Sequence, residues 1–261
     1  MELEAFRRWT QRLIDNLKQD ERVLGLVMLG SAAEIRRIPD AWSDHDFFVI
    51  TQPGVQEAMR VNLDWLPDAE QIVLSPRETE HGLKVLFADG HVIEFAVFDL
   101  EEVHRARVND YRVLFEPADG AISALVRQSE ERDASAPPFD HGREAELLLS
   151  LVVIGSGRVA RGEVLVGSRF IKDFALSAYL RMLAHQVAPA PGSIPDNLDP
   201  FRRVEQCYPQ IAPRIHALLL LPPLDAATAL VDLAVSTLHS LPASALPVVR
   251  SEIERAKNYN G

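Results

Sequence analysis

Residues 23–50 read VLGLVMLGSAAEIRRIPDAWSDHDFFVI, and this stretch decides the fold of the chain. An apolar run ends at Gly30 and Ser31, and twelve residues separate Ser31 from Asp44, which is followed after one residue by Asp46 and a second apolar run. Side chains at positions i and i+2 of a strand point to the same side, so the two carboxylates should lie together. A glycine followed by a small hydroxyl residue leaves room for a phosphate to approach the backbone. The stretch therefore predicts two strands with an acidic site at their ends.

A third carboxylate stands in the strand predicted at residues 91–98. Glu94 lies there between Ile93 and Phe95, where a carboxylate is costly to bury without a partner. Magnesium favours one or two carboxylates together with phosphates and water, so a metal-binding role or a general-base role would each explain it. An exposed position on one face of the sheet would also explain it. His45, between the two aspartates, should point to the opposite side, and we interpret it as structural.

The remaining periodicity predicts an α+β protein with two domains. The first domain, residues 1–128, is a mixed sheet with helices, followed by a linker at residues 129–140 (SEERDASAPPFD) and a helical bundle at residues 141–261. In the first domain we expect helices at 4–18, 32–37 and 55–66 and strands at 22–29, 46–50, 71–74, 83–88, 91–98 and 111–115. The dipeptide Asp89-Gly90 predicts a tight hairpin between two of these strands.

Composition excludes several classes of function. The chain has 38 acidic and 27 basic residues among 261, a formal net charge of -11 that disfavours broad binding to nucleic acid and suits a cationic partner. Cys207 is the single cysteine, so neither an internal disulfide nor a cysteine-based metal site is expected. No long uncharged apolar run predicts a membrane span, and the charged N-terminus lacks a signal-peptide core. A reducing, cytoplasmic location is the expectation.

The Gly30-Ser31 turn, followed by Asp44-x-Asp46, resembles the signature of the polymerase-β-like nucleotidyltransferases. Within that superfamily the chain looks most like the enzymes that modify lincosamide and aminoglycoside antibiotics. Four stretches carry this resemblance, namely residues 20–31, 43–47, 92–99 and 161–163.

The resemblance implies a site in which Asp44, Asp46 and Glu94 hold Mg²⁺ or act on the reacting groups, with Glu94 activating the acceptor hydroxyl. Gly30 and Ser31 would hold the phosphates of a nucleoside triphosphate, with ATP the expected co-substrate. Two basic residues of the helical half, Arg169 and Lys172, would reach the same triphosphate, although a solvated helix face explains them equally well.

Three functions are compatible with these features. The leading one is transfer of a nucleoside monophosphate to a hydroxyl of a small molecule, such as an aminoglycoside or a lincosamide. The alternatives are transfer to a protein hydroxyl, as in toxin–antitoxin systems, and a non-catalytic nucleotide-binding module. The acceptor and the base are left open by the residues, because specificity of this kind has no local spacing. The apolar helices after Pro213 fit either a homodimer interface or the core of their own bundle.

Overall fold

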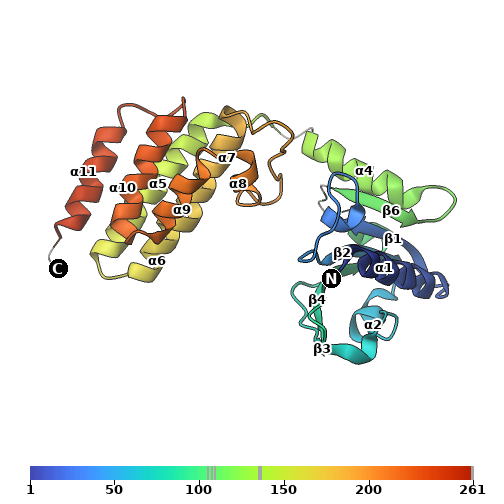
Figure 1. The fold of residues 1–261 in the computed structure, drawn as a ribbon. Helices are drawn as coiled ribbons and strands as arrows, with labels where there is room; N and C mark the ends of the chain where they lie inside the picture. Colours follow the sequence, from blue (N-terminus) through green and yellow to red (C-terminus); the bar gives the residue numbers. More distant parts are fainter. Residues whose placement is uncertain (105, 107, 109, 135–136, 260–261) are drawn as a thin grey trace. The chain divides into compact units, whose positions relative to one another are not determined.

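The computed structural model of the chain describes residues 1–104, 106, 108, 110–134 and 137–259 (Figure 1). Contacts between residues divide it into two compact units, Met1–Ala136 and Pro137–Gly261. Each unit buries hydrophobic clusters of its own, so each is described by itself. In the described ranges of the chain, no helix combines the length and apolar character that a membrane crossing requires.

The first unit is built on a six-stranded mixed sheet, as predicted. Its strands are β1 (Val23–Leu29), β2 (His45–Thr51), β3 (Ile72–Leu74), β4 (Gly82–Phe87), β5 (Val92–Phe98) and β6 (Tyr111–Phe115). They lie in the order β3-β4-β5-β2-β1-β6. The neighbours β2 and β5 run parallel, and every other neighbouring pair is antiparallel.

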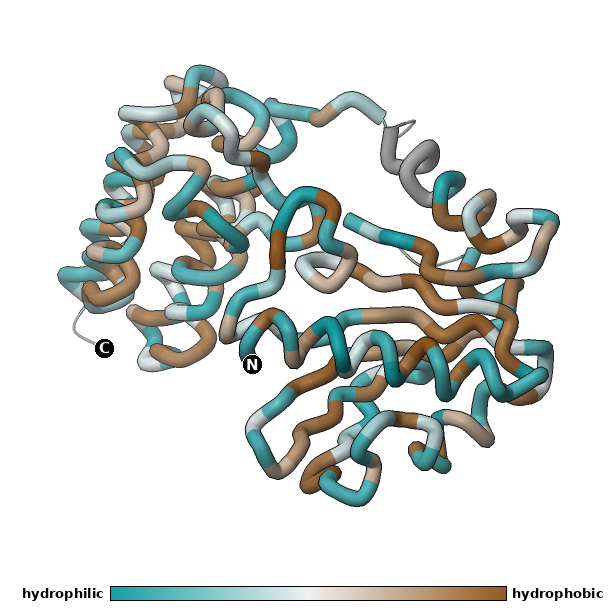
Figure 2. Tube along the Cα trace, turned by 45° about the vertical axis from the view of Figure 1, so that its right-hand side comes forward, coloured by the Kyte–Doolittle hydropathy of each residue, from teal (hydrophilic) through white to brown (hydrophobic). Residues whose placement is uncertain are grey.

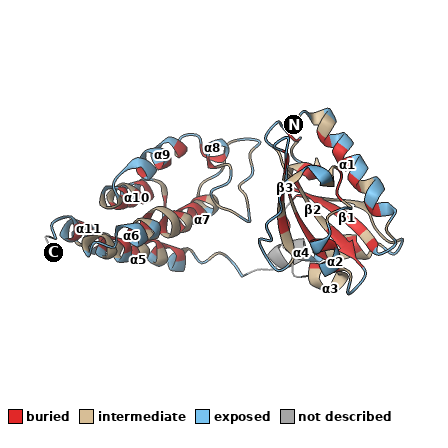
Figure 3. Ribbon diagram, turned by 90° about the horizontal axis from the view of Figure 1, so that it is seen from below, coloured by how far each residue is buried: buried red, intermediate tan, exposed pale blue. Residues whose placement is uncertain are grey.

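Helix α1 (Leu3–Lys18) covers one face of this sheet. Its residues Phe6, Trp9, Leu13 and Leu17 recur at helical spacing and are buried against the strands. On the other face, α3 (Leu100–Val103) and α4 (Ala121–Ala134) contribute to a separate cluster. Figure 2 shows the hydrophobic strand residues in brown, and Figure 3 shows buried residues on the strands in red. Both faces of the sheet therefore carry a core.

Two predicted helices of the first unit are shorter than expected. The helix expected at 32–37 is a single 3-10 turn, η1 (Gly30–Ala33), because Glu34 has the left-handed conformation with φ 52° and ends it. The helix expected at 55–66 is α2 (Gln56–Val61), and it ends where the Asn62 side chain accepts a hydrogen bond from the backbone N–H of Asp64. A short 3-10 turn, η2 (Ala69–Gln71), precedes β3.

The segment expected to be a linker, residues 129–140, begins as helix. Helix α4 continues to Ala134, so the first six of these residues extend it. Their sequence, SEERDA, contains good helix formers and no proline, whereas Pro137 and Pro138 follow only later. Residues 135 and 136 lie outside the described part of the chain.

The second unit is helical, as predicted. It contains α5 (His141–Ala160), α6 (Val164–Arg169), the π-helical turn η3 (Phe170–Ala175), α7 (Leu176–Gln186), α8 (Val204–Cys207), α9 (Ala212–Leu220), α10 (Pro223–Thr237) and α11 (Leu246–Lys257). Cys207 is buried in its core, as a packing role predicts.

Helix α5 approaches α6 and η3 so closely that only glycine fits at the contact. A Cβ atom at Gly155 would lie 2.7 Å from Cγ1 of Ile171 and 3.0 Å from the carbonyl oxygen of Gly167. We therefore expect Gly155→Ala to lower the free energy of unfolding of this unit by about 1–3 kcal/mol. Gly157→Ala on the same helix is the matched control, because a Cβ there meets nothing within 4 Å. Urea titrations followed by circular dichroism compare the two, and equal stability of the two variants would contradict the expectation.

Candidate functional site

The predicted acidic residues meet on neighbouring strands. In the parallel pair formed by β2 and β5, Asp46 stands directly opposite Glu94, and in the antiparallel pair formed by β4 and β5, Glu94 stands opposite Lys84. Residues in register across a sheet project from the same face. A row of three charged side chains therefore crosses three adjacent strands, and it lies on the face opposite α1.

Glu94 is held by an ion pair that the sequence analysis did not predict. Its Oε1 lies 3.0 Å from Nζ of Lys84, and the same ammonium lies 3.1 Å from Oε1 of Glu78. Hydrogen bonding to Glu94 first, and then to Glu78, raises the pKa of Lys84 above its ordinary value. The Glu94 side chain is 39% exposed, so a molecule on this face can reach its carboxylate.

Asp44, Asp46 and Gly30 are gathered at the end of the sheet where β1 ends and β2 begins. Both aspartates are partly buried, and the strand alternation places them on the face that carries Glu94. Gly30 has φ 54°, a conformation that favours glycine, and a Cβ built there would lie 3.9 Å from Oδ2 of Asp46. The backbone of Gly30 thus passes directly beside the Asp46 carboxylate, with no side chain between them.

Asp110, the residue just before β6, fixes this turn. Its carbonyl oxygen accepts a hydrogen bond of 2.8 Å from the N–H of Gly30. Its carboxylate, with a side chain 5% exposed, lies 3.2 Å from Nε of Arg36 and 3.0 Å from Nη2 of Arg37. These two arginines follow the Gly30-Ser31 turn in the sequence, so Asp110 ties the turn to the segment after it. No sequence pattern pointed to Asp110.

Metal binding at this site would rest on two carboxylates. Among the residues that the structure describes, no three side chains of His, Cys, Asp or Glu form a group able to hold a metal ion. Asp44 and Asp46 supply oxygen donors two residues apart on one face, which suits a cation that takes its other ligands from phosphates and water. Glu94 forms an ion pair with Lys84, so we do not include its carboxylate in this pair of metal donors.

His45 projects into the core on the α1 side, as predicted. It is completely buried and stacks on Phe6 with 3.5 Å between ring centroids. Its Nδ1 lies 2.7 Å from Nε2 of His91, and its Nε2 lies 3.0 Å from the hydroxyl oxygen of Thr10. Burial lowers the pKa of His45 to about 2 and that of His91 to about 4. Both imidazoles are therefore neutral near pH 7 and structural in role.

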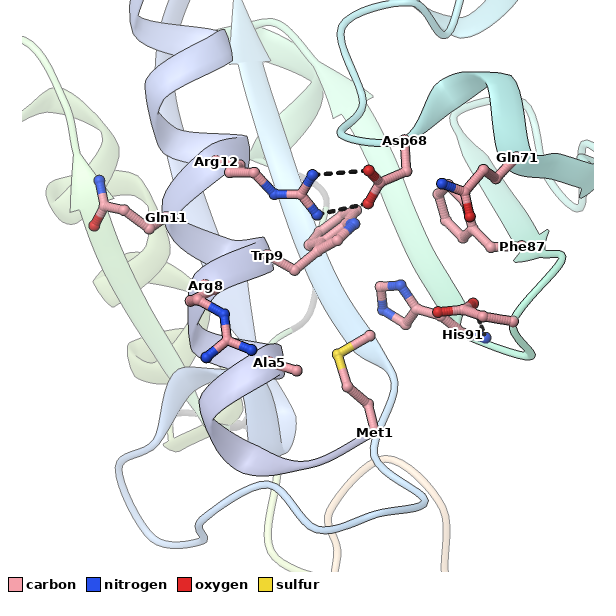
Figure 4. A pocket seen from close by; sticks show the side chains of 11 residues that line it. Met1, Ala5, Arg8, Trp9, Gln11, Arg12, Asp68, Gln71, Phe87 and His91 are labelled. Atoms are coloured by element: carbon pink, nitrogen blue, oxygen red, sulfur yellow. Dashed lines mark hydrogen bonds and ion pairs between the residues drawn. The ribbon is translucent and has the colours of Figure 1, made fainter.

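A pocket of about 470 Å³ lies beside this histidine pair, between α1 and the turn of the β4–β5 hairpin (Figure 4). Trp9, Phe87 and His91 face one another there, and Arg12 forms a two-pronged ion pair with Asp68 at 2.6–2.7 Å. The pocket lies on the α1 face of the sheet. It is therefore separated from the acidic row by the sheet itself.

The two basic residues predicted for the triphosphate belong to the second unit. Nζ of Lys172 donates to the carbonyl oxygens of Leu219 and Leu221 at 2.8 and 2.5 Å, next to the C-terminal end of α9. Arg169 lies 3.4 Å from Asp173 and 4.8 Å from the ring centroid of Phe174, and its side chain is 66% exposed. Lys172 thus has a structural task within its unit, whereas Arg169 is largely in solvent.

The chain is similar to several proteins of solved structure. No protein-family model and no curated protein sequence matches the chain. An aminoglycoside 6-adenyltransferase from Bacillus subtilis is similar with 12% identity and a TM-score of 0.33, over 98% of this chain and 92% of that one.

Two further solved structures are similar to the chain. CdnC of E. coli MS115-1, solved as a complex named CdnC:HORMA-deltaN, has 15% identity and a TM-score of 0.31, with 90% of each chain covered. The CD-NTase CdnG of Bradyrhizobium diazoefficiens, solved with GTP, has 14% identity and a TM-score of 0.25, over 99% of this chain and 92% of that one. The matched proteins include nucleotidyltransferases, the class that the sequence resembles. The roles of individual residues in this chain rest on its own geometry.

Proposed function

We propose that the chain is a magnesium-dependent nucleotidyltransferase that moves a nucleoside monophosphate from a triphosphate to a hydroxyl of a small molecule. The observation that carries this proposal is the register of β2 and β5, which sets Asp46 beside Glu94 on one face of the sheet. Asp44 joins them through the i, i+2 alternation, and Gly30 places no side chain beside Asp46.

Asp44 and Asp46 are the residues that we assign to magnesium. When bound, the ion would neutralise charge on the triphosphate, which is the main requirement of phosphoryl chemistry. We assign the phosphates to Ser31 and to the space that Gly30, which has no side chain, leaves beside Asp46.

We assign Glu94 as the general base that takes up the proton of the acceptor hydroxyl. The hydroxyl oxygen forms a bond to the α-phosphorus, the bond from that phosphorus to pyrophosphate breaks, and the hydroxyl proton passes to the Glu94 carboxylate. The ion pair with Lys84 at 3.0 Å holds this carboxylate in place on the strand face. Since Lys84 also contacts Glu78, the ammonium keeps an anionic partner when Glu94 takes up the proton.

The identity of the two substrates is proposed on chemical grounds. The net charge of -11 favours a cationic acceptor, and an aminoglycoside or lincosamide antibiotic with free hydroxyls fits that description. ATP is the proposed donor. We assign catalysis to residues 1–128 and place the protein in the cytoplasm.

The test of this function is magnesium-dependent release of pyrophosphate. Purified protein is incubated with each of the four nucleoside triphosphates, with and without a pooled panel of aminoglycosides and lincosamides. Release that requires both magnesium and the pool supports the proposal, and division of the pool then identifies the acceptor. No release with any triphosphate across antibiotic and metabolite panels would refute small-molecule transfer.

Glu94→Gln should separate binding from turnover. The amide keeps the size of the side chain but cannot take up a proton, so kcat should fall by at least about 100-fold. The dissociation constant of the triphosphate, measured by calorimetry, should stay within about twofold, because Glu94 is not assigned to that ligand. Glu78→Gln is the matched control, since Glu78 also contacts Lys84 yet lies outside the strand row. An equal loss in both variants would contradict the role of Glu94.

A further inference from the structure

The segment that leads into the acidic site exposes large apolar side chains. Residues 34–43 join η1 to β2, and within them Ile35 is 59%, Ile38 67% and Trp42 96% exposed. Single exposed apolar residues are ordinary on protein surfaces, whereas a cluster beside a polar site commonly marks a binding surface. Trp42 presents both faces of its indole ring to solvent.

Several polar contacts hold this segment in place. They are a two-pronged ion pair from Arg7 to Glu34, the ion pairs of Arg36 and Arg37 with Asp110, and a turn in which Asp40 accepts from the backbone N–H of Trp42 at 2.8 Å. A segment fixed at its start, middle and end loses little conformational freedom when a ligand binds. The backbone that carries Trp42 is therefore held in place before a ligand binds.

Trp42 is close to the carboxylates assigned to magnesium. It precedes Asp44 by two residues, so the two Cα atoms can be at most about 7 Å apart. The same segment carries Arg36 and Arg37, whose side chains are 55% and 36% exposed. A guanidinium has five N–H donors, so both arginines retain donors beyond those that Asp110 uses. One short segment thus offers a planar ring and two cations beside the site.

We propose that residues 34–43 form a nucleotide platform, on which the base of the triphosphate stacks against Trp42 while Arg36 and Arg37 face its phosphates. This inference rests on the proposed function and adds the residues that bind the donor nucleotide. A nucleotide has a planar base and negatively charged phosphates. The platform has an indole ring that can stack on the base and two guanidinium groups that can bind the phosphates. A sugar-like acceptor can also lie against an aromatic ring, but it carries no phosphates to face Arg36 and Arg37. Because every base has a π face, the platform would accept several bases.

Tryptophan fluorescence provides a direct test. The chain has three tryptophans, and Trp42 is the exposed one: Trp9 is 2% exposed, and Trp65 is partly buried with its Nε1 donating to the Met59 carbonyl oxygen at 3.0 Å. The full chain is titrated with ATP and with GTP in the presence of magnesium and without acceptor. We expect saturable quenching and protection of Trp42 from acrylamide. Both signals should vanish in Trp42→Phe, while the affinity of that variant stays near that of the wild type.

Calorimetry then separates the ring from the phosphates. Trp42→Ala should weaken ATP binding about tenfold or more, since stacking on an aromatic side chain is lost. Inorganic tripolyphosphate, which has no base, should bind Trp42→Ala and the wild type equally. Tyr259→Ala removes another exposed aromatic side chain, in the second unit, and should change neither affinity.

Three results would overturn the platform. If the wild type and Trp42→Ala bound ATP equally and no quenching occurred, the nucleotide platform would be refuted, whereas the proposed function would not be affected. Unchanged ATP affinity with a raised KM for the acceptor would assign the ring to the acceptor instead. A wild-type protein that binds no triphosphate would overturn both the platform and the proposed function.

Discussion

Replacing Asp46 by asparagine is expected to lower magnesium-dependent pyrophosphate release by about 1000-fold. Asp46 is assigned to magnesium. It stands opposite Glu94, which is assigned to the acceptor, and beside Gly30, which is assigned to the phosphates. Asparagine has nearly the same shape but no charge, and it is a weaker ligand for a hard cation. The loss should therefore appear in kcat/KM without a change of fold, and initial rates of pyrophosphate release measure it.

The matched control for this substitution is Asp64→Asn, which removes one negative charge from an exposed loop of the same unit. Its activity should stay within about twofold of the wild type, because screened surface charges act weakly at a distance. If Asp46→Asn retained the activity of Asp64→Asn, the acidic row would not be the reaction centre. Thermal unfolding of both variants checks that the folded state is retained.

Acidification should destabilise the first unit by about 4 kcal/mol between about pH 7 and pH 5. Burial lowers the pKa of His45 to about 2 and that of His91 to about 4, whereas both titrate near 6.5 in the unfolded chain. Below about pH 6.5 the unfolded state therefore binds protons that the folded state does not. Stability is full above this pH and falls as the pH falls, by about 1.4 kcal/mol per pH unit for each histidine.

Tryptophan fluorescence during urea unfolding measures this effect, because all three tryptophans belong to the first unit. In His91→Gln, the difference in unfolding free energy between the two pH values should shrink by about 2 kcal/mol. His104→Gln removes an exposed histidine and should leave the difference as it is in the wild type. A pH-independent unfolding free energy in the wild type would show that the buried pair does not govern acid stability.

The strands and the face of each acidic residue were predictable from the sequence, since both follow from local alternation. Asp44, His45 and Asp46 sort to two faces by their spacing alone. A two-residue turn at Asp89-Gly90 would have set Val85 opposite Glu94. The loop is one residue longer, since the N–H of Phe87 donates to the carbonyl oxygen of His91, and Lys84 stands opposite Glu94 instead. The parallel pairing of β2 with β5, by contrast, could not be predicted from local sequence. Forty residues lie between the end of β2 and the start of β5, and the pairing of these strands depends on how the whole unit packs.

Other features depend on one backbone conformation or on contacts between residues that are far apart in the sequence. The residues around Glu34 do not predict its left-handed conformation, which limits the helix expected at 32–37 to a single turn. Its partner in the ion pair, Arg7, lies on α1. Likewise, the position of Lys172 beside Leu219 and Leu221 follows from the packing of the helical unit. Contacts of this range leave no spacing signal in the sequence.

Strand β2 alternates between residues that build the core and residues assigned to the chemistry. His45 and Phe47 are wholly buried on the α1 side, while Asp44 and Asp46 belong to the opposite face. Inserting a single residue between them would turn an aspartate into the core and the histidine outward, whereas inserting two would restore both faces. The spacing of the acidic pair is therefore constrained by the core on the α1 side as well as by the chemistry assigned to the opposite face.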